Sequence, residues 1–283
     1  MRTEQEILDL IMHVATADER IRAVVLNGSR ANPDVKKDHL RDFDIVCFVH
    51  HINSFLDNHY WINIFGERII LQVPKMMDIG ETNKDPSFQY LMLFKDGNRI
   101  DLTLFPVNKI KSDYVKDSLT MVLLDKDKLF ADLPEPSQKD YLIKPPAEKE
   151  FLDCCNEFWW VSTYVAKGLL RNQVTYAKEI LEIPVRNMFM KMIEWYIGLQ
   201  THFSVSFGKA GKNMQIHLHR TLYKKILSTY PDAEKENIWQ AVFEMAVLFS
   251  EFAHETANAM NFKYHEEEEK NVMEYLKKVY ENS

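Results

Sequence analysis

The hydrophobic residues in the first half of the chain change their spacing repeatedly, from the period of a helix to that of strands. Between Ile7 and Val14 they recur every three or four residues, which predicts an amphipathic helix over residues 3–17. Thr3, followed three residues later by Glu6, has the pattern of a capping box at the start of this helix. Short runs rich in β-branched and aromatic residues then predict strands over residues 22–27, 43–49, 68–73, 90–94, 99–105 and 121–124. Residues 1–135 are therefore expected to form a mixed α/β domain with a small sheet.

Proline marks the place where this pattern ends. Four of the ten prolines lie within residues 132–146, and proline interrupts regular elements because it lacks an N–H donor. Beyond them the apolar residues keep a helical period, which predicts helices over residues 148–170, 174–203, 213–229, 234–259 and 266–280, the second bent or broken at Pro184. The expected fold is α+β. An N-terminal domain with a small mixed sheet flanked by helices is followed by a C-terminal α-helical bundle domain over residues 136–283.

Composition and charge narrow the class of protein. The chain has 283 residues, of which 46% are apolar and 27% charged, as is ordinary for a soluble globular protein. Asp and Glu outnumber Lys and Arg by 42 to 35, and this net charge of −7 disfavours a general nucleic-acid binder while suiting a cationic partner. Three cysteines are too few for a disulfide scaffold. Since the chain shows neither a long apolar run nor a basic, apolar leader, we expect a cytoplasmic protein that does not enter the membrane.

The first candidate for chemistry is a turn directly after the strand predicted over residues 22–27. Gly28 lets backbone N–H groups approach a phosphate closely, and the side chains of Ser29 and Arg30 add hydrogen-bond donors. Turns of this kind are common after strands. The three residues are therefore candidate phosphate-binding residues only in combination with other motifs.

Three aspartates on two predicted strands form the second candidate. Asp42 and Asp44 stand two residues apart at the start of a strand, so their side chains point to the same face. Two carboxylates held so close repel each other unless a cation neutralises them, and Mg²⁺ is a natural partner for oxygen ligands. Asp101 lies among apolar residues on an expected internal strand, where aspartate is unusual; the alternative is a solvated acid on a half-exposed strand. Because acid pairs of this spacing also occur by chance in so acidic a chain, the metal site is a hypothesis that needs all three motifs.

Taken together, these motifs resemble a known pattern. A helix, a strand ending in Gly-Ser, an Asp-x-Asp strand and a third Asp on a later strand are typical of the nucleotidyltransferase superfamily of the DNA polymerase β type. The amino-acid sequence around these motifs further resembles that of the aminoglycoside 6-adenylyltransferases, the streptomycin-inactivating enzymes of Gram-positive bacteria. The segments that carry this likeness are LNGSRAN (26–32), DFDIV (42–46), DGNRIDLTL (96–104), LLDKD (123–127) and CCNEFW (154–159).

The resemblance implies roles for the residues of the first domain. Asp42 and Asp44 would hold two Mg²⁺ ions that bridge the phosphates of ATP, the co-substrate. Asp101 would complete the metal site and is the candidate base for the drug hydroxyl. Ser29 and Arg30, next to Gly28, would contact the β- and γ-phosphates. These residue types suit AMP transfer, because the reaction needs a nucleophilic hydroxyl, a neutralised phosphate and a stabilised leaving group.

The helical domain is expected to bind the drug and part of the nucleotide. Lys167 matches a lysine that reaches the triphosphate in related enzymes. Streptomycin carries two guanidinium groups and an amine, so its pocket should hold acids and aromatic rings. The best candidate cluster is Glu157, Trp159, Trp160 and Tyr164. Alternatively, Trp159 and Tyr164 are core residues and Glu157 is a solvated acid. Weaker candidates for the same role are Glu194, Trp195 and Asp85.

The predicted function is transfer of AMP from Mg-ATP to the 6-hydroxyl of streptomycin, with release of pyrophosphate and antibiotic resistance as the consequence. We expect the site between the two domains, small-molecule partners only, no nucleic acid, and a monomer or weak dimer. One alternative is a nucleotidyltransferase that AMPylates a protein partner, as an antitoxin does. Another is a non-catalytic binding module, against which the presence of all three aspartates argues.

Overall fold

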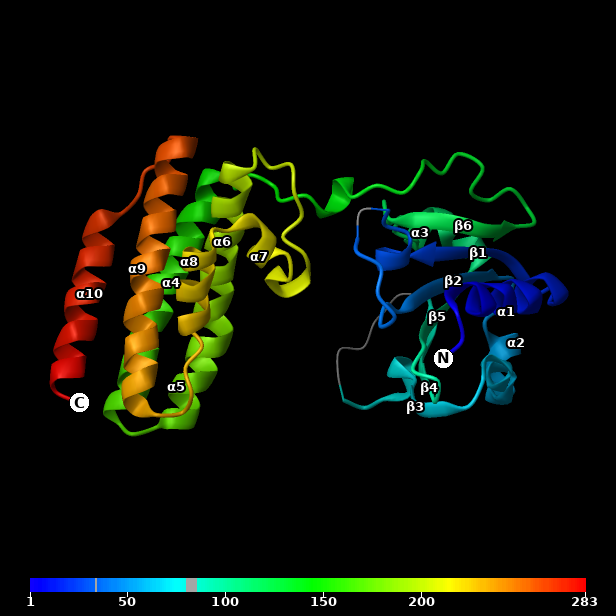
Figure 1. Ribbon diagram of the computed structural model, residues 1–283, viewed down its shortest axis with the longest axis horizontal. Coiled ribbons are helices and arrows are strands. Elements are labelled where there is room, and N and C mark those ends of the chain that lie inside the picture. The colour runs from blue at the N-terminus through cyan, green and yellow to red at the C-terminus, as the bar shows by residue number, and fades with distance from the viewer. Residues whose placement is uncertain (34, 80–85) are drawn as a thin grey trace. The chain divides into compact units, whose positions relative to one another are not determined.

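The computed structural model describes residues 1–33, 35–79 and 86–283, which form two compact units (Figure 1). The first unit, Met1–Asp140, contains a mixed sheet with helices. The second, Tyr141–Ser283, is built from helices. The predicted α+β fold is therefore confirmed.

Six strands of the first unit form one sheet in the order β3-β4-β5-β2-β1-β6. β2 and β5 are parallel, while the other neighbours run antiparallel. The strands are β1 (Ile21–Asn27), β2 (Phe43–Val49), β3 (Arg68–Gln72), β4 (Phe88–Phe94), β5 (Arg99–Pro106) and β6 (Thr120–Asp125). Each corresponds to a strand that the sequence predicts, with ends that differ by one or two residues. The sheet is what brings distant segments of the sequence together at the site.

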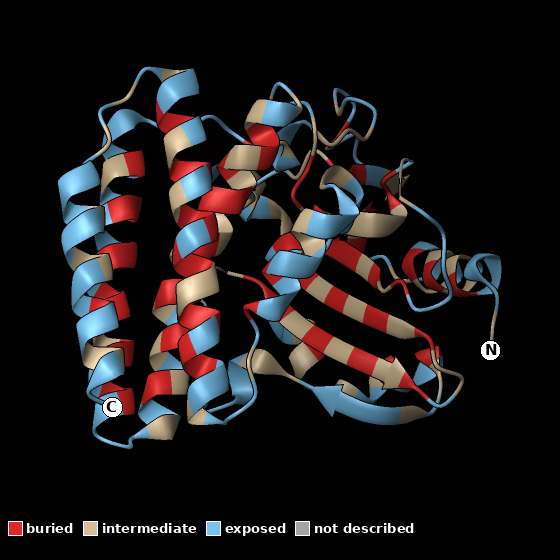
Figure 2. Ribbon diagram, turned by 60° about the vertical axis from the view of Figure 1, so that its left-hand side comes forward, coloured by how far each residue is buried: buried red, intermediate tan, exposed pale blue. Residues whose placement is uncertain are grey.

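Helix α1 (Glu4–Ala17) covers part of this sheet. Thr3 caps it, and the reciprocal bonds between Thr3 and Glu6 form the predicted capping box. Buried Ile7 and Ile11 pack into the same core as the inner residues of the strands. In β4 and most of β5, buried and half-buried residues alternate, because successive side chains point to opposite faces (Figure 2). β1 and β2 are instead buried along runs of successive residues. Two short helices, α2 (Asn53–Leu56) and α3 (Ile110–Asp113), were not predicted, since four residues show no helical period.

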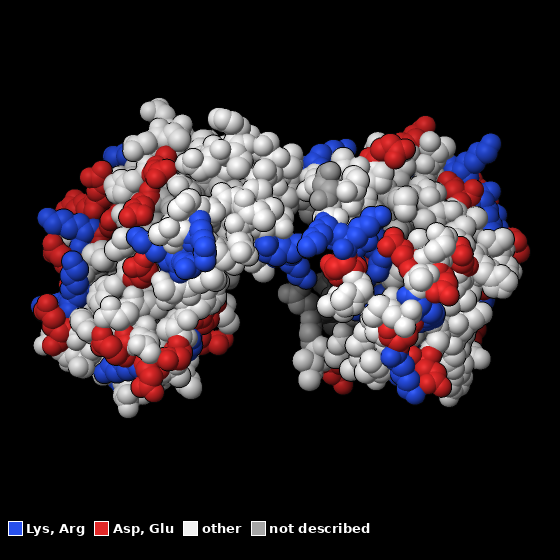
Figure 3. All heavy atoms as spheres, viewed as in Figure 1, with Lys and Arg blue, Asp and Glu red and all other residues white. Residues whose placement is uncertain are grey.

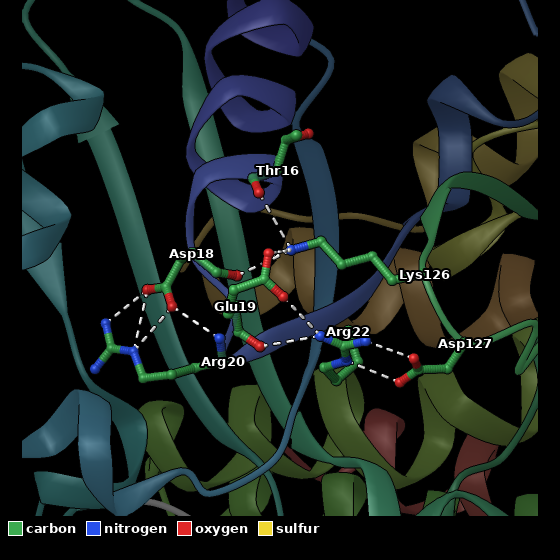
Figure 4. A network of polar contacts seen from close by, with 7 residues as sticks. All are labelled: Thr16, Asp18, Glu19, Arg20, Arg22, Lys126 and Asp127. Atoms are coloured by element: carbon green, nitrogen blue, oxygen red, sulfur yellow. Dashed lines mark hydrogen bonds and ion pairs between the residues drawn. The ribbon is translucent and has the colours of Figure 1, made fainter.

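Polar contacts hold the turn between α1 and β1 against the end of β6 (Figure 4). Arg22 of β1 ion-pairs with Asp127, which follows β6, and with Glu19 of the turn. The ammonium group of Lys126 donates to the backbone carbonyls of Thr16 and Asp18, each at 3.2 Å. Except for the local pair of Arg22 and Glu19, these contacts join residues more than a hundred positions apart in sequence. They hold β1, the strand that ends at the candidate site.

The second unit is a bundle around the aromatic pair Phe158 and Phe249, whose rings stack at 3.7 Å. Its helices are α4 (Glu148–Leu170), α5 (Val174–Ile180), α6 (Arg186–Gln200), α7 (Met214–His217), α8 (Arg220–Ser228), α9 (Lys235–Met260) and α10 (Glu266–Glu281). A π-helical turn, Leu181–Val185, links α5 and α6 and contains Pro184. The chain therefore continues through the proline in a wider turn, which absorbs the missing N–H donor.

The helix predicted over residues 213–229 is wrong as a single element. The structure divides it into α7 and α8, because Leu218 and His219 adopt extended backbone angles. The ring of His219 then accepts the N–H of Thr221 and caps α8. Of the helices that the structure describes, none combines the length and the apolar character needed to cross a membrane.

Candidate active site

A tight turn at the end of β1 carries the first candidate motif. β1 ends at Asn27, and Gly28 follows with a φ of +71°, a conformation that glycine adopts without strain. A Cβ atom at Gly28 would lie 2.6 Å from Oδ2 of Asp44, so a side chain here would force the Asp44 carboxylate to shift. The Gly28 N–H donates to the carbonyl of Leu119 at 3.0 Å and holds the turn in place. The turn therefore lies directly against the carboxylate of Asp44.

The sheet brings the three predicted aspartates to one place. In the parallel pair of β2 and β5, Asp44 is the register partner of Asp101, and on its other side it pairs with Asn27 of β1. Asp42 lies two residues earlier, just ahead of β2. Burial, together with the carboxylates of Asp101 and Asp42, raises the pKa of Asp44 to about 6. Burial also raises the pKa of Asp42. The raised pKa values indicate that Asp42 and Asp44 are short of positive charge, and carboxylate oxygens are the hard ligands that Mg²⁺ takes.

The side chain of Arg99 lies across these carboxylates. Its Nε and Nη2 donate to the two carboxylate oxygens of Asp101, each at 2.7 Å, and its Nη1 is 3.6 Å from Oδ2 of Asp42. Within the described residues, no three His, Cys, Asp or Glu side chains are grouped so that they could hold a metal ion. Arg99 is not among the predicted site residues, although its position two residues before Asp101 places both on one face of β5.

Arg30, predicted to contact phosphate, lies beneath the turn. Its side chain is 4% exposed, its guanidinium carbon is 3.6 Å from the ring centroid of Phe43, and it ion-pairs with Glu4 at 2.8 Å. It also donates to the backbone carbonyls of Asp42 at 3.0 Å and Arg41 at 2.6 Å. In this structure, therefore, the guanidinium of Arg30 holds the segment that carries Asp42.

Arg41 belongs to the same cluster. Its side chain is 5% exposed, donates to the backbone carbonyl of Ser29 at 3.1 Å and ion-pairs with Glu4 at 3.3 Å. Ser29 itself is half-buried in the turn after β1. Glu4 of α1 thus connects two arginines that fix the candidate phosphate-binding turn. The sequence does not mark Arg41 or Glu4, because partners 37 positions apart share no local pattern.

Trp159, one of the predicted drug contacts on α4, faces the core of the helical unit. It is 3% exposed, and its ring packs edge-on against Phe249. Its indole N–H donates to the hydroxyl of Tyr264 at 3.1 Å, and that hydroxyl donates to Glu269 at 2.7 Å. This burial favours the alternative in which Trp159 is a core residue.

The other predicted residues of α4 lie nearer the surface. Glu157 and Lys167 are exposed, and Tyr164 is half-buried. The indole N–H of Trp160, whose side chain is exposed, donates to the hydroxyl of Tyr164 at 2.7 Å. The ammonium group of Lys167 lies 4.8 Å from the centre of the Tyr164 ring. Trp160, Tyr164 and Lys167 therefore form one surface cluster.

Glu157 lines a hollow of about 590 Å³ between α4 and α6, and Trp195 lines it from α6. The remaining lining residues are Glu150, Asp153, Cys154, Asn156, Asn187, Met188 and Lys191. Lys191 ion-pairs with Glu194 at 3.5 Å, so this acid is already engaged. The structure thus brings Glu157 together with Trp195 instead of Trp159. Asp85 lies outside the described residues.

Comparisons with known proteins match the whole chain. The model of the streptomycin adenylyltransferase family matches residues 1–279. An aminoglycoside 6-adenylyltransferase of Bacillus subtilis is 38% identical over 281 residues, which are 99% of either chain. Its namesake in Staphylococcus aureus is 35% identical over 285 residues and is covered completely, as is this chain. A crystal structure of an aminoglycoside 6-adenyltransferase from Bacillus subtilis is 34% identical, covers 99% of both chains and has a TM-score of 0.48.

Proposed function

The chain belongs to the streptomycin adenylyltransferase family and is a nucleotidyltransferase, and from this premise we propose that it transfers AMP from Mg-ATP to the 6-hydroxyl of streptomycin. Pyrophosphate is the second product, and the modified drug no longer acts on the cell, which confers resistance. The observation that carries the proposal is the meeting of Asp42, Asp44 and Asp101 beside the Gly28 turn.

We propose a task in this chemistry for each residue of the site, and two tasks for Asp101. Asp42, Asp44 and Asp101 would hold two Mg²⁺ ions, which when bound supply neutralisation of the phosphate charge. Asp101 is also the candidate base that accepts the proton of the drug hydroxyl. The backbone N–H groups and the hydroxyl of the turn at Gly28 and Ser29 would meet the phosphate tail.

The arginine after the turn receives a different task. We assign Arg30 the role of positioning Asp42, because its guanidinium already binds Glu4 and two backbone carbonyls. A phosphate contact by Arg30 would require it to leave these partners. Lys167 forms no ion pair with a carboxylate of the described residues, and its ammonium group lies over the ring of Tyr164. We propose that it supplies a cation for the triphosphate.

Drug recognition is proposed for the helical unit. A carboxylate at Glu157 suits a guanidinium group of streptomycin, and the ring of Tyr164 suits an adjacent cation or sugar face. Trp159 would support these residues from the core through its bond to Tyr264. Trp195 lines the same hollow as Glu157 but is 1% exposed, so we propose that it too supports the site from the core.

Pyrophosphate release tests this function directly. Purified protein with ATP, Mg²⁺ and a panel of aminoglycosides should release pyrophosphate with streptomycin, and NMR of the product should place AMP on the 6-hydroxyl. Asp44→Asn should reduce the rate to background, because it removes a metal ligand at the reacting phosphate. Asp127→Asn, an aspartate of the same unit that pairs with Arg22 away from the site, should retain activity.

The same assay separates the alternative activity. A protein-modifying nucleotidyltransferase would release no pyrophosphate with any aminoglycoside, and mass spectrometry would instead find one AMP added to a co-purified protein. Absence of pyrophosphate release with every aminoglycoside contradicts the proposal, and AMP on a co-purified protein would then support the alternative. The full-length likeness to enzymes named for aminoglycosides supports the small-molecule substrate.

A further inference from the structure

Arg99 binds two of the carboxylates that the proposed function assigns to a divalent cation. Its guanidinium fork binds both carboxylate oxygens of Asp101, and its free edge faces Asp42 at 3.6 Å. Such a bidentate arrangement is the strongest form of an arginine–carboxylate pair. The oxygens that it uses are the ones that a metal ion would need.

The charges of the site explain why this arrangement forms. Three carboxylates on two neighbouring strands repel one another, and one guanidinium offsets part of that repulsion. Arg99 holds both carboxylate oxygens of Asp101, and among the described residues no three His, Cys, Asp or Glu side chains are grouped so that they could hold a metal ion. The side chain of Arg99 is nevertheless 42% exposed, so it has room to move aside.

We propose that Arg99 is an internal counter-ion that competes with the divalent cation for Asp101 and Asp42. This inference rests on the proposed function, because it treats these aspartates as metal ligands. A metal ion that arrives alone has to displace a cation and leave it without a partner. A metal ion that arrives with a nucleotide brings phosphate oxygens to which the guanidinium can turn. Arg99 thus acts as a counter-ion of the aspartates as long as the metal ion is absent.

The competition makes an unusual prediction, namely that removing a site residue strengthens metal binding. Mn²⁺ binds the same hard oxygen ligands as Mg²⁺ and is visible by electron paramagnetic resonance. Titration of nucleotide-free protein with Mn²⁺, at one fixed pH, should give about fivefold to tenfold tighter binding to Arg99→Gln than to the parent protein. Arg99→Lys, which keeps the charge but loses the fork, should fall between them.

A matched control separates competition from a general charge effect. Arg22→Gln also removes one ion-paired arginine from a strand of the same unit, but its partners are Asp127 and Glu19. It should bind Mn²⁺ as the parent does. Circular dichroism and thermal melting test whether each variant is folded. If Arg99→Gln does not fold, the Mn²⁺ affinity of Arg99→Lys is compared with that of the parent instead.

Two outcomes would overturn the inference. If folded Arg99→Gln binds Mn²⁺ no more tightly than the parent, Arg99 does not compete with the metal. If it binds more weakly, Arg99 is a structural support of the aspartates. The titration contains no drug and is therefore independent of the substrate. If Arg99→Gln binds Mn²⁺ more tightly but the parent releases no pyrophosphate with any aminoglycoside, the counter-ion role of Arg99 is supported and the proposed function is rejected.

Discussion

At the scale of single residues, the contact between Gly28 and Asp44 leads to a sharp prediction. Gly28→Ala places a Cβ atom 2.6 Å from the Asp44 carboxylate and forces alanine into a positive φ. The strain should cost about 1 kcal/mol of stability, and displacement of Asp44 should lower kcat by about 100-fold. Thermal unfolding and the pyrophosphate assay measure the two effects.

Gly97 provides the matched control for this change. It also has a positive φ, +84°, but a Cβ atom there would meet only the flexible end of Met1 at 2.8 Å. Gly97→Ala should therefore lose similar stability and keep its kcat. Equal loss of kcat in both variants would show that strain, and not the contact with Asp44, limits the enzyme.

The raised pKa of Asp44 predicts a conflict between function and stability. The pKa of Asp44 is about 6 in the folded protein, and its ordinary value, which applies to the unfolded chain, is 3.8. Between these two pH values the folded state therefore binds more protons than the unfolded state. Stability then falls as the pH rises through this window, and the full cost is present above it. In metal-free protein, Asp44→Asn should be more stable than the parent by about 1–2 kcal/mol near pH 8, after allowance for partial exposure, and the gain should vanish near pH 4.

Asp127→Asn gives the opposite sign in the same measurement. A hydrogen bond from Arg22 lowers the pKa of Asp127, so loss of this carboxylate should destabilise the protein at neutral pH. Chemical denaturation in the presence of a chelator compares the two variants. A destabilising Asp44→Asn at high pH would mean that burial and the neighbouring carboxylates do not raise the pKa of Asp44 as described.

The local pattern of the sequence predicts the positions of some site residues and not of others. Asp42 and Asp44 are predictable because a spacing of two on a strand fixes their shared face. Their approach to Asp101 follows from adjacent parallel strands, which only the superfamily resemblance could anticipate. Arg30 looks like a phosphate ligand in sequence but is buried, because Glu4, 26 positions away, binds it. Long-range partners of this kind carry no local signal.

At the scale of elements, the sequence predicts the long amphipathic helices and the strands well. It predicts the positions where a helix is interrupted poorly. Strands and helices with strong period, such as α4, appear at the expected residues. Pro184 was expected to bend or break a helix, and the π turn shows how the chain accommodates it. The division between α7 and α8 was missed, since a capping role for the ring of His219 depends on two backbone angles that no apolar period records.

The two faces of α4 yield a prediction that separates binding from packing. Glu157→Gln removes an exposed carboxylate and should raise the KM for streptomycin by about tenfold with little change in kcat. Trp159→Phe removes a buried indole and its bond to Tyr264, and should cost about 1–3 kcal/mol of stability while the KM stays the same. A raised KM for folded Trp159→Phe would instead restore Trp159 as a drug contact.

At the scale of the whole molecule, the surplus of negative charge is unevenly distributed along the chain. Residues 195–231 contain no Asp or Glu, so all 42 acids lie elsewhere. On the face shown in Figure 3, acidic and basic side chains are interspersed on both units. We expect the net charge of −7 to give a long-range negative field, and local acids such as Glu157 to provide the short-range contacts with the drug.

This field predicts opposite salt effects for the two substrates. Streptomycin is a polycation, so screening should weaken its attraction to the protein, and its kcat/KM should fall several-fold between about 0.02 and 0.3 M salt, where the Debye length drops below about 10 Å. Mg-ATP is anionic, so its kcat/KM should rise or stay level over the same range. Steady-state kinetics in sodium chloride and in potassium acetate of equal ionic strength distinguish screening from binding of a particular ion. If both substrates lose kcat/KM in parallel, salt acts on the enzyme itself; if neither responds, the drug is held by local contacts alone and the acidic balance of the chain has no part in its capture.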